Sequence, residues 1–327
     1  MHSYAAGFRR VGAEVETYCV ARAYRRGLGR TPSRVAGRVA PNAMIERFNR
    51  RVLEDLSARR PHLVLVLKGQ QLAPQTILEL RQRTGGVWVN YYPDDPFSPE
   101  RANRLTFGPA ALRAYDHCLT FAGDLVDRYR AAGISKVDWL PFARDPDQHF
   151  PVPPVEPPEF EVMFAGNLDA ERVRWLEPVA RSFRLAILAD QRRAARGSTL
   201  RLATFEAPAF GEALPRALAR AAISLNVMRE QNRLNHNMRS YESPACGAFT
   251  LSQRTPELER LFREDEEIAF VESPAEIVER IRYWLDRPAD RRRIAAGGFR
   301  RVESDTYDER ARSILETAGI VPHAGVA

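Results

Sequence analysis

The chain has 327 residues, which suggests roughly two domains, and its apolar share of 44% is ordinary for a globular protein. Its longest apolar run, HLVLVL, has the length of a strand, so we expect no integral membrane segment. The first residues, MHSYAAGFRRVGAE, lack the apolar core of a secretory signal. The three cysteines, Cys19, Cys118 and Cys246, are far apart and form no CxxC pair. This pattern favours buried thiols in a reducing, cytoplasmic compartment over zinc ligands or disulfides.

The net charge of +7 and the pI of about 9.6 can indicate nucleic acid binding. However, the arginines are interleaved with acids, as in SPAEIVERIRYWLDRPADRRR, and the densest clusters contain no aromatic residue except Phe299. Solvated helix faces explain such a pattern without a nucleic-acid groove. We therefore expect no nucleic acid partner, and a nucleic-acid-binding α/β protein stays as the alternative that the charge alone supports.

The first half of the chain alternates strand-like and helical segments. Apolar strands are expected at 14–20, 62–67, 87–92, 117–121 and 136–140. Helices are expected at 42–59, 73–83, 101–113 and 122–132. Continuous apolar strands between amphipathic helices predict a mostly parallel sheet that is covered on both faces. The Arg- and Gly-rich stretch 25–41 is interpreted as a mobile loop, with disorder as the alternative.

The proline-dense segment DPDQHFPVPPVEPPEF predicts a linker, because proline removes backbone donors and restricts φ. After it the alternation resumes, with strands at 161–165, 184–188, 222–227, 248–252 and 267–271, and helices that include 275–286, 289–298 and 307–319. The segment 192–210 is interpreted as loops around a short element. These patterns predict a first domain at 1–150, a linker at 151–158, a second domain at 159–304 and a C-terminal helix and tail at 305–327 that pack back on the first domain.

The beginning of the chain departs from the pattern of a Rossmann-like domain, which opens with a strand, a glycine-containing turn and a helix. Here HSYAAGFRRVGA already has the pattern of the first helix, and 14–20 that of the second strand. We expect the first domain to lack its first strand, either because the start site is misassigned or because the sheet has an open slot. An open slot would leave unpaired backbone groups beside it.

The region after the strand at 222–227 carries the most informative motif. Arg239 and Glu242 are three residues apart and share one face of a helix. A guanidinium and helix N-terminal amides can hold phosphate oxygens, and a carboxylate can accept hydrogen bonds from ribose hydroxyls, so the pair suits a nucleoside diphosphate. The same spacing is also typical of a surface salt bridge beside a core helix.

The stretch NMRSYESPACGAFTLS resembles the signature of the CgeB-like (spore-maturation) glycosyltransferases, an Asn-x-Arg-x-x-Glu followed by Ala-Cys-Gly and a short strand. The similarity continues through ELERLFREDEEIAFVESPAEIVERIRYWLDRPADRRR, and VNYYPDDP, WLPFARDPDQHF and VMFAGNLDAERVRWL also match, so it covers nearly the whole chain. The resemblance implies an α/β GT-B-like architecture, in which two Rossmann-like domains face a cleft. It also implies a metal-independent, hexosyltransferase-like enzyme that needs no cofactor. Such an enzyme moves a sugar from a nucleotide-sugar donor to a hydroxyl of a glycan, polysaccharide or protein.

The resemblance also implies which residues contact the donor. Glu242 resembles the ribose-binding glutamate of GT-B enzymes. The partner glutamate that many retaining members carry eight residues earlier is Leu234 here, so that sugar contact cannot be carried over. This loss and the absent first strand motivate the alternative of a non-catalytic nucleotide-sugar-binding relative, or a partner of an active transferase. The residues expected to bind the nucleotide sugar are Gly166, Asn167, Asn226, Asn237, Arg239 and Glu242.

Two of these residues, Gly166 and Asn167, stand where a strand ends and a helix begins. Ligands of open α/β sheets bind at the carboxyl ends of strands, and glycine lets a phosphate or base approach the backbone. A plain strand-to-helix turn with a polar cap is the alternative there and for Asn226, which ends another strand. Asn237 and its neighbour Asn235 are polar alternatives for the missing sugar contact.

The candidate catalytic residues are Asp94 and Asp95, which follow the strand 87–92 at its carboxyl end. They could orient an acceptor hydroxyl or act as a general base, whereas a turn in YYPDDP would explain them without chemistry. His236 is a further possible base, although lone histidines commonly cap or pack.

Three other patterns are considered and given less weight. Asp145-Pro-Asp147 spells an Asp-x-Asp metal motif, but it lies in the proline-rich segment without the strand and turn that such a motif needs, so we expect no metal site. Lys68 ends a strand and could touch an acceptor or phosphate, or simply occupy a turn. Asp305 replaces a histidine of the related family.

Overall fold

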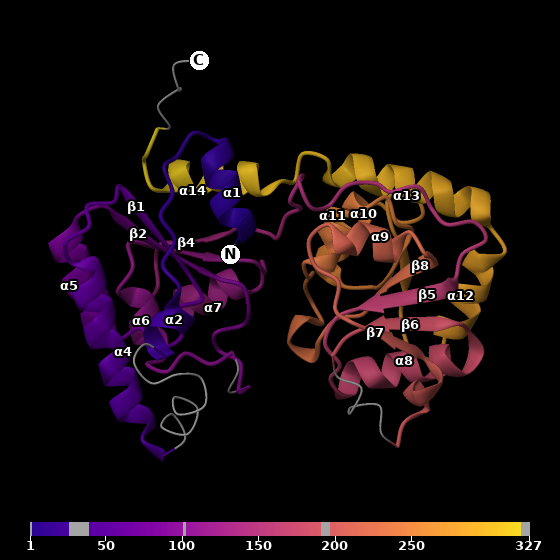
Figure 1. Cartoon of the computed structure of the whole chain (residues 1–327), viewed down its shortest axis with the longest axis horizontal. Helices are drawn as coiled ribbons and strands as arrows, with labels where there is room; N and C mark the ends of the chain where they lie inside the picture. Colours follow the sequence, from indigo (N-terminus) through magenta and orange to yellow (C-terminus); the bar gives the residue numbers. More distant parts are fainter. Residues whose placement is uncertain (1, 26–38, 101–102, 191–196, 322–327) are drawn as a thin grey trace. The chain divides into compact units, whose positions relative to one another are not determined.

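The computed structural model describes residues 2–25, 39–100, 103–190 and 197–321. The chain divides into two units (Figure 1): Met1–Pro141 with Arg310–Ala327, and Phe142–Glu309. Most of the predicted mobile loop 25–41 lies outside the described residues. The domain boundaries expected around the proline-rich segment stay a prediction.

The first unit is built on a parallel sheet of four strands in the order β1-β2-β3-β4. The strands are β1 (Leu63–Leu67), β2 (Val87–Tyr92), β3 (His117–Thr120) and β4 (Val137–Trp139). The helices assigned before or between them are α1 (His2–Arg10), α2 (Val20–Arg25), α4 (Pro41–Leu56), α5 (Pro74–Thr84), α6 (Pro109–Arg113) and α7 (Leu125–Ala131). Five of the six residues of β2 are buried, as expected for a central strand that is covered on both faces.

The strand predicted at 14–20 is wrong. No strand is assigned there, and α2 begins at Val20. Glu14, Glu16, Thr17 and Cys19 are exposed. A strand is stabilised by pairing with a neighbour, and in the described part of the chain the assigned pairing of β1 is with β2. The expectation that the first domain lacks its usual first strand stays a prediction.

The second unit contains a parallel sheet of six strands in the order β10-β9-β8-β5-β6-β7. The strands are β5 (Phe160–Ala165), β6 (Leu185–Leu188), β7 (Thr204–Glu206), β8 (Ala221–Asn226), β9 (Thr250–Gln253) and β10 (Ala269–Val271). The helices are α8 (Ala170–Ser182), α9 (Ala213–Leu218), α10 (Arg239–Ala245), α11 (Pro256–Leu261), α12 (Ile277–Leu285) and α13 (Pro288–Val302), with short 3-10 turns at Thr199–Leu202 and Glu230–Asn232. The last helix, α14 (Tyr307–Thr317), begins in this unit, and from Arg310 it belongs to the first.

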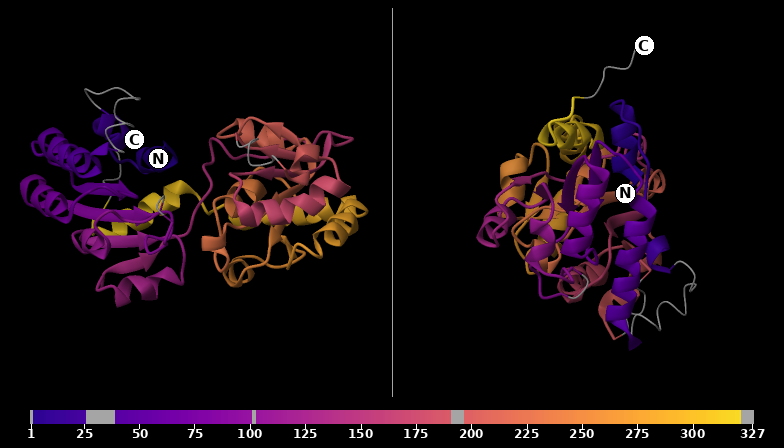
Figure 2. Two further views of the ribbon diagram at one scale, coloured as in Figure 1. Left: turned by 90° about the horizontal axis from the view of Figure 1, so that it is seen from below. Right: turned by 90° about the vertical axis from the view of Figure 1, so that its left-hand side faces the viewer.

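Alternation of side chains along β5 gives this sheet two apolar faces. Val162 and Phe164 point to a core formed with α8 and α12, whereas Met163 and Ala165 point to a second core formed with α9. The helices on the two faces can be followed in Figures 1 and 2. The sheet is therefore covered by helices on both faces. The ends of its strands are where a ligand can reach it.

The cysteine prediction holds in part. Cys118 and Cys246 are free and buried, and burial raises the pKa of each thiol to about 12. Cys19 is exposed, so the expectation that it is buried is wrong, because the segment that carries it forms no strand. Within the described residues, no helix is long and apolar enough to cross a membrane.

The helix α13 packs closely against backbone in the second unit. A Cβ atom on Gly297 would overlap the carbonyl oxygen of Glu266, and one on Gly298 would lie 2.5 Å from the carbonyl oxygen of Glu267. The turn that carries Glu266 and Glu267 therefore fits only a glycine pair on the helix.

We expect Gly297→Ala to lower the free energy of unfolding by about 2 kcal/mol, because the steric overlap exceeds the gain in helix propensity. Urea unfolding measures the change. Ala296→Ser is the matched control, since Ala296 lies next to Gly297 on the same helix. Equal stability of Gly297→Ala and the wild type would contradict the packing described.

Candidate functional site

The connectivity of the second sheet places a switch point between β5 and β8. From β5 the chain moves outward through β6 and β7, and then returns to β8 on the other side of β5. Ligands of open α/β sheets bind where the strand order reverses, at the carboxyl ends of the strands. β5 ends at Ala165 and β8 at Asn226, so residues that follow these positions form the candidate site.

Arg239 and Glu242 meet near the carboxyl ends of β5 and β8, a region that we call the carboxyl edge of the sheet. Arg239 Nη1 lies 2.6 Å from Glu242 Oε2, and Arg239 Nε donates to the carbonyl oxygen of Ala165 at 3.1 Å. Glu242 is only 5% exposed, so the pair is not the surface salt bridge that the spacing also allowed. The guanidinium connects α10 to the end of β5 and holds the carboxylate beside the switch point.

Arg172 is a further cation at this edge, and the sequence analysis missed it. It is 8% exposed, and its guanidinium donates to the carbonyl oxygens of Val227 (3.0 Å) and Asn167 (2.9 Å). In the described part of the chain, no ion pair joins it to a carboxylate. Burial, and the positive charges of Arg229 and Arg239, lower its pKa to about 10, against the opposing effect of Asp169. A buried cation without a carboxylate partner is costly, and an anion would relieve that cost.

A signal for Arg172 was present in the sequence. Arg172 lies in the first turn of α8, where the helix dipole favours acidic residues over basic ones. A basic residue at that position, shortly after Gly166, is therefore unusual, and it is consistent with a ligand that supplies the negative charge.

Gly166 and Asn167 form the turn between β5 and α8. A Cβ atom on Gly166 would lie 3.4 Å from Arg172 Nη1 and 3.3 Å from the ring of Phe164, so a side chain there would crowd the guanidinium. Asn167 is exposed. Asp169 caps α8 by accepting the backbone N–H of Arg172 at 3.0 Å. Gly166 and Asn167 therefore lie at the switch point, and their contact with a ligand stays a prediction.

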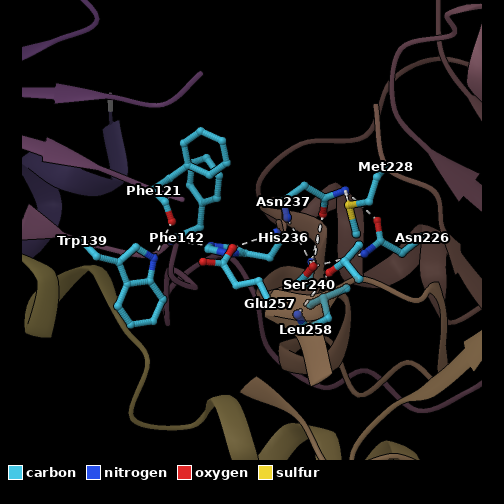
Figure 3. Close-up of polar contacts among 11 residues, drawn as sticks. Phe121, Trp139, Phe142, Asn226, Met228, His236, Asn237, Ser240, Glu257 and Leu258 are labelled. Atoms are coloured by element: carbon cyan, nitrogen blue, oxygen red, sulfur yellow. Dashed lines mark hydrogen bonds and ion pairs between the residues drawn. The ribbon is translucent and has the colours of Figure 1, made fainter. Parts of the chain in front are cut away.

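Asn226 and Asn237 are placed differently from the residues above. The Asn237 amide donates to Asn226 Oδ1 at 2.8 Å, and the Asn226 amide donates to the hydroxyls of Ser240 and Ser252. Asn226 is 3% exposed and Asn237 9% exposed. Figure 3 shows this network at the start of α10 with Met228, whose sulfur accepts from the Asn237 amide. The two amides connect β8 to α10, and their direct contact with a ligand stays a prediction.

From the sequence, the N-terminal amides of α10 are expected to hold phosphates, but the structure gives one of these amides a partner within the chain. The helix has seven residues, and the Ser240 N–H donates to the carbonyl and side-chain oxygens of Asn237. Because the chain itself uses this amide, the cations at the edge are better placed than the helix terminus to hold an anion.

His236 is fully buried, and both of its ring nitrogens have partners within the second unit. Its Nε2 accepts the backbone N–H of Phe142 at 3.2 Å, and its Nδ1 lies 2.7 Å from Glu257 Oε2. Glu257 Oε2 also accepts the backbone N–H of His236. Figure 3 shows the imidazole between Phe142 and Glu257. These contacts support a structural role, and they oppose the interpretation of His236 as a catalytic base.

In the first unit, Asp94 and Asp95 have separate environments. Asp95 Oδ1 accepts the backbone N–H of Phe97 (2.8 Å) within the turn, and Oδ2 accepts Arg128 of α7 (2.9 Å), so both oxygens have structural partners. Asp94 Oδ2 lies 2.7 Å from Lys68 Nζ, and both side chains are partly exposed. Lys68 has a φ of 68°, a left-handed conformation that is unusual for a residue with a side chain. Such backbone strain is found preferentially at functional sites.

The Asp-x-Asp and Asp305 patterns have structural explanations. Asp145 is fully buried and its carboxylate accepts from Gln148 (2.6 Å) and from the backbone of Asp147 (3.2 Å). Asp305 pairs with Arg301 at 2.7 Å, and its carbonyl accepts the backbone N–H of Arg144. The described residues contain no group of three or more His, Cys, Asp or Glu that could hold a metal ion.

Comparison with known proteins agrees with this architecture. A glycosyl transferase-like family model matches residues 172–316. A sucrose-phosphate synthase from Thermosynechococcus elongatus superposes with a TM-score of 0.67 at 15% identity, over 84% of this chain and 77% of that one. The chain has a GT-B fold. Anabaena HepE in complex with UDP-glucose superposes with a TM-score of 0.63 at 12% identity, over 86% of this chain and 83% of that one.

A third GT-B structure, the lipopolysaccharide outer core galactosyltransferase WaaB, superposes with a TM-score of 0.56 at 12% identity, over 85% of this chain and 81% of that one. None of the curated proteins compared with the chain matches it. The glycosyl transferase-like match includes Arg172, Asn226, Asn237, Arg239 and Glu242, and it begins after Gly166 and Asn167.

We expect Glu257→Leu to lower the free energy of unfolding by about 3 kcal/mol, because two buried N–H groups of His236 would lose their acceptor. Glu257→Gln keeps an acceptor oxygen and is the matched control, with an expected loss of less than half as much. Urea unfolding of the two variants and the wild type tests this. Similar stabilities of the Glu257→Leu and Glu257→Gln variants would show that the contact contributes little to folding.

Proposed function

We propose that the chain is a nucleotide-sugar-dependent glycosyltransferase of the GT-B type, and that its second unit binds the donor. The observation that carries the proposal is the group of buried Arg172, buried Glu242 and half-buried Arg239 at the switch point of a parallel sheet. The group combines cations for a diphosphate with a carboxylate for a ribose, which are the two parts of a nucleoside diphosphate that a protein can recognise whatever its base.

In the proposed complex, the diphosphate binds beside Gly166. Its oxygens accept hydrogen bonds from the guanidinium N–H groups of Arg172 and Arg239 that the main-chain carbonyls and Glu242 do not use. Both guanidiniums are held in place by main-chain carbonyls, Arg239 by Ala165 and Arg172 by Val227 and Asn167. Preorganised cations stabilise the negative charge that develops on the leaving nucleoside diphosphate. The residues therefore supply leaving-group stabilisation from side chains, and we propose a metal-independent transfer.

The ribose hydroxyls are proposed to donate to Glu242. Its Oε2 already accepts Arg239, and a carboxylate has enough lone pairs to accept further hydrogen bonds. HepE is described in complex with UDP-glucose, and the pneumococcal O-GlcNAc transferase GtfA in complex with UDP and GlcNAc. We propose a UDP-hexose as the donor, and membership of the CgeB-like group for the chain.

The acceptor hydroxyl is proposed to lose its proton to a carboxylate of the first unit. Asp94 is the better candidate of the predicted pair, because both oxygens of Asp95 already accept hydrogen bonds, one from the backbone of Phe97 and one from Arg128. Lys68 holds Asp94 Oδ2 at 2.7 Å, and a general base needs such an orienting contact to meet the hydroxyl that it deprotonates. A glycan, polysaccharide or protein hydroxyl is the proposed acceptor.

The donor site is tested by thermal shift with UDP, GDP, dTDP, CDP and ADP, and with inorganic pyrophosphate. We expect one nucleotide to raise the melting temperature of the wild type, because a ligand that binds only the folded state stabilises it. Arg172→Met should lose the response to both pyrophosphate and the nucleotide. Glu242→Gln should keep the response to pyrophosphate and bind the nucleotide about tenfold more weakly, since it lacks the charged acceptor for ribose.

An absence of any shift in the folded wild-type protein would refute the donor site. Nucleotide binding without turnover across a panel of donor sugars and acceptors would instead favour the non-catalytic relative.

For the base, we expect Asp94→Asn to lower kcat by about 100-fold or more with little change in the KM of the donor, because only proton abstraction is lost. Asp95→Asn should mainly lower the melting temperature, since it weakens the contact with Arg128. Steady-state kinetics on both variants separates the two roles. A kcat of Asp94→Asn close to that of the wild type would remove Asp94 from the mechanism.

A further inference from the structure

His149 is a buried histidine beside the candidate site that the mechanism above does not use. Its side chain is 6% exposed, and its Nε2 lies 3.9 Å from Glu242 Oε1. Glu242 Oε2 is the oxygen that accepts Arg239, so the imidazole and the guanidinium face different oxygens of one carboxylate. Glu242 is thus held by Arg239 on one side and has the imidazole of His149 near its other oxygen.

The tautomer of His149 follows from its other nitrogen. The backbone N–H of Asp145 donates to His149 Nδ1 at 3.1 Å, so Nδ1 carries no proton. Burial, as the largest effect, lowers the pKa of His149, against the opposing charges of Glu242 and Asp145. The neutral ring therefore carries its single proton on Nε2, and this N–H faces Glu242 Oε1.

The backbone around His149 is held firmly. Arg144 donates to the carbonyl oxygens of Val302 and Glu303, and the Asp145 carboxylate accepts from Gln148. The His149 N–H donates to the Asp145 carbonyl at 2.8 Å. The imidazole thus projects from a tight turn, 145–149, and a fixed donor costs little reorganisation when a ligand binds.

We propose that His149 is a positioning residue that orients Glu242 Oε1 toward the ribose of the donor, and so sets the preference for ribonucleotides over 2′-deoxyribonucleotides. The proposal rests on the proposed function, because it concerns the ribose subsite of the same site. When the donor binds, the N–H of the neutral ring closes from 3.9 Å to a hydrogen bond with Glu242 Oε1, and it adds no second positive charge to the one that Arg239 supplies. The remaining lone pairs of the carboxylate stay available for the ribose hydroxyls.

Two substitutions separate the functions of the two ring nitrogens. His149→Gln can place an amide N–H near the position of Nε2, so it keeps a donor for Glu242. His149→Asn can place an amide oxygen near the position of Nδ1, so it keeps the acceptor for the Asp145 N–H and removes the donor. Melting temperatures of both variants establish that they fold.

The experiment is isothermal titration of wild type and both variants with UDP, ADP, GDP and CDP and with the 2′-deoxy form of each. For the nucleotide that the wild type binds, we expect His149→Asn to raise the Kd of the ribo form about tenfold and to change the Kd of the deoxy form less than about twofold. His149→Gln should keep the Kd of the ribo form within about threefold of the wild type.

Each other outcome overturns the proposal. An unchanged ratio of ribo to deoxy affinity in His149→Asn would show that His149 does not act on the ribose contact. Equal weakening of both forms in both variants would assign His149 a purely structural role. Failure of the folded wild type to bind any of these nucleotides would overturn the role of His149, and failure to bind dTDP as well would overturn the proposed function itself.

Discussion

A carboxylate buried between a guanidinium and an imidazole organises the carboxyl edge of the second sheet. Glu242 contacts Arg239 at 2.6 Å, and its other oxygen faces His149 at 3.9 Å. A buried charge needs such partners, because an unpaired one costs several kcal/mol. Since Arg239 also bonds the carbonyl of Ala165, the pair joins α10 to β5 and fixes the distance between the carboxylate and the switch point.

The polar residues around this carboxylate divide into two groups with different uses. Asn226 and Asn237 satisfy each other and the serines near them, so they hold β8 and α10 together. The guanidinium of Arg172 hydrogen-bonds main-chain carbonyls and lies 5.4 Å from the centre of the Phe164 ring, and in the described part of the chain no direct ion pair joins it to a carboxylate. The hydrogen-bonded amides of Asn226 and Asn237 therefore stabilise the local structure. Arg172, which has no direct carboxylate partner, is the group that a phosphate would stabilise.

The first unit shows a comparable division between two adjacent carboxylates. Asp95 stabilises the turn after β2, whereas Asp94 pairs with Lys68 at the carboxyl ends of β1 and β2. Lys68 holds a left-handed backbone conformation that costs of order 1–3 kcal/mol. Neighbours in the sequence thus have separate functions, because consecutive side chains after a strand point in different directions.

The sequence by itself determined the parallel α/β architecture, the positions of nine strands and the shared helix face of Arg239 and Glu242, because apolar periodicity and i,i+3 spacing are local properties. It also led to a strand at 14–20 that does not form, since a strand depends on a partner that local sequence does not reveal. Only the tertiary structure decided that Arg172 and His149 lie at the same edge as Glu242, and that His236 and Asp95 are held by structural partners. Several of the contacts that decide this join residues between 33 and 94 positions apart in the chain, so burial and partners at that range are set by packing and not by spacing.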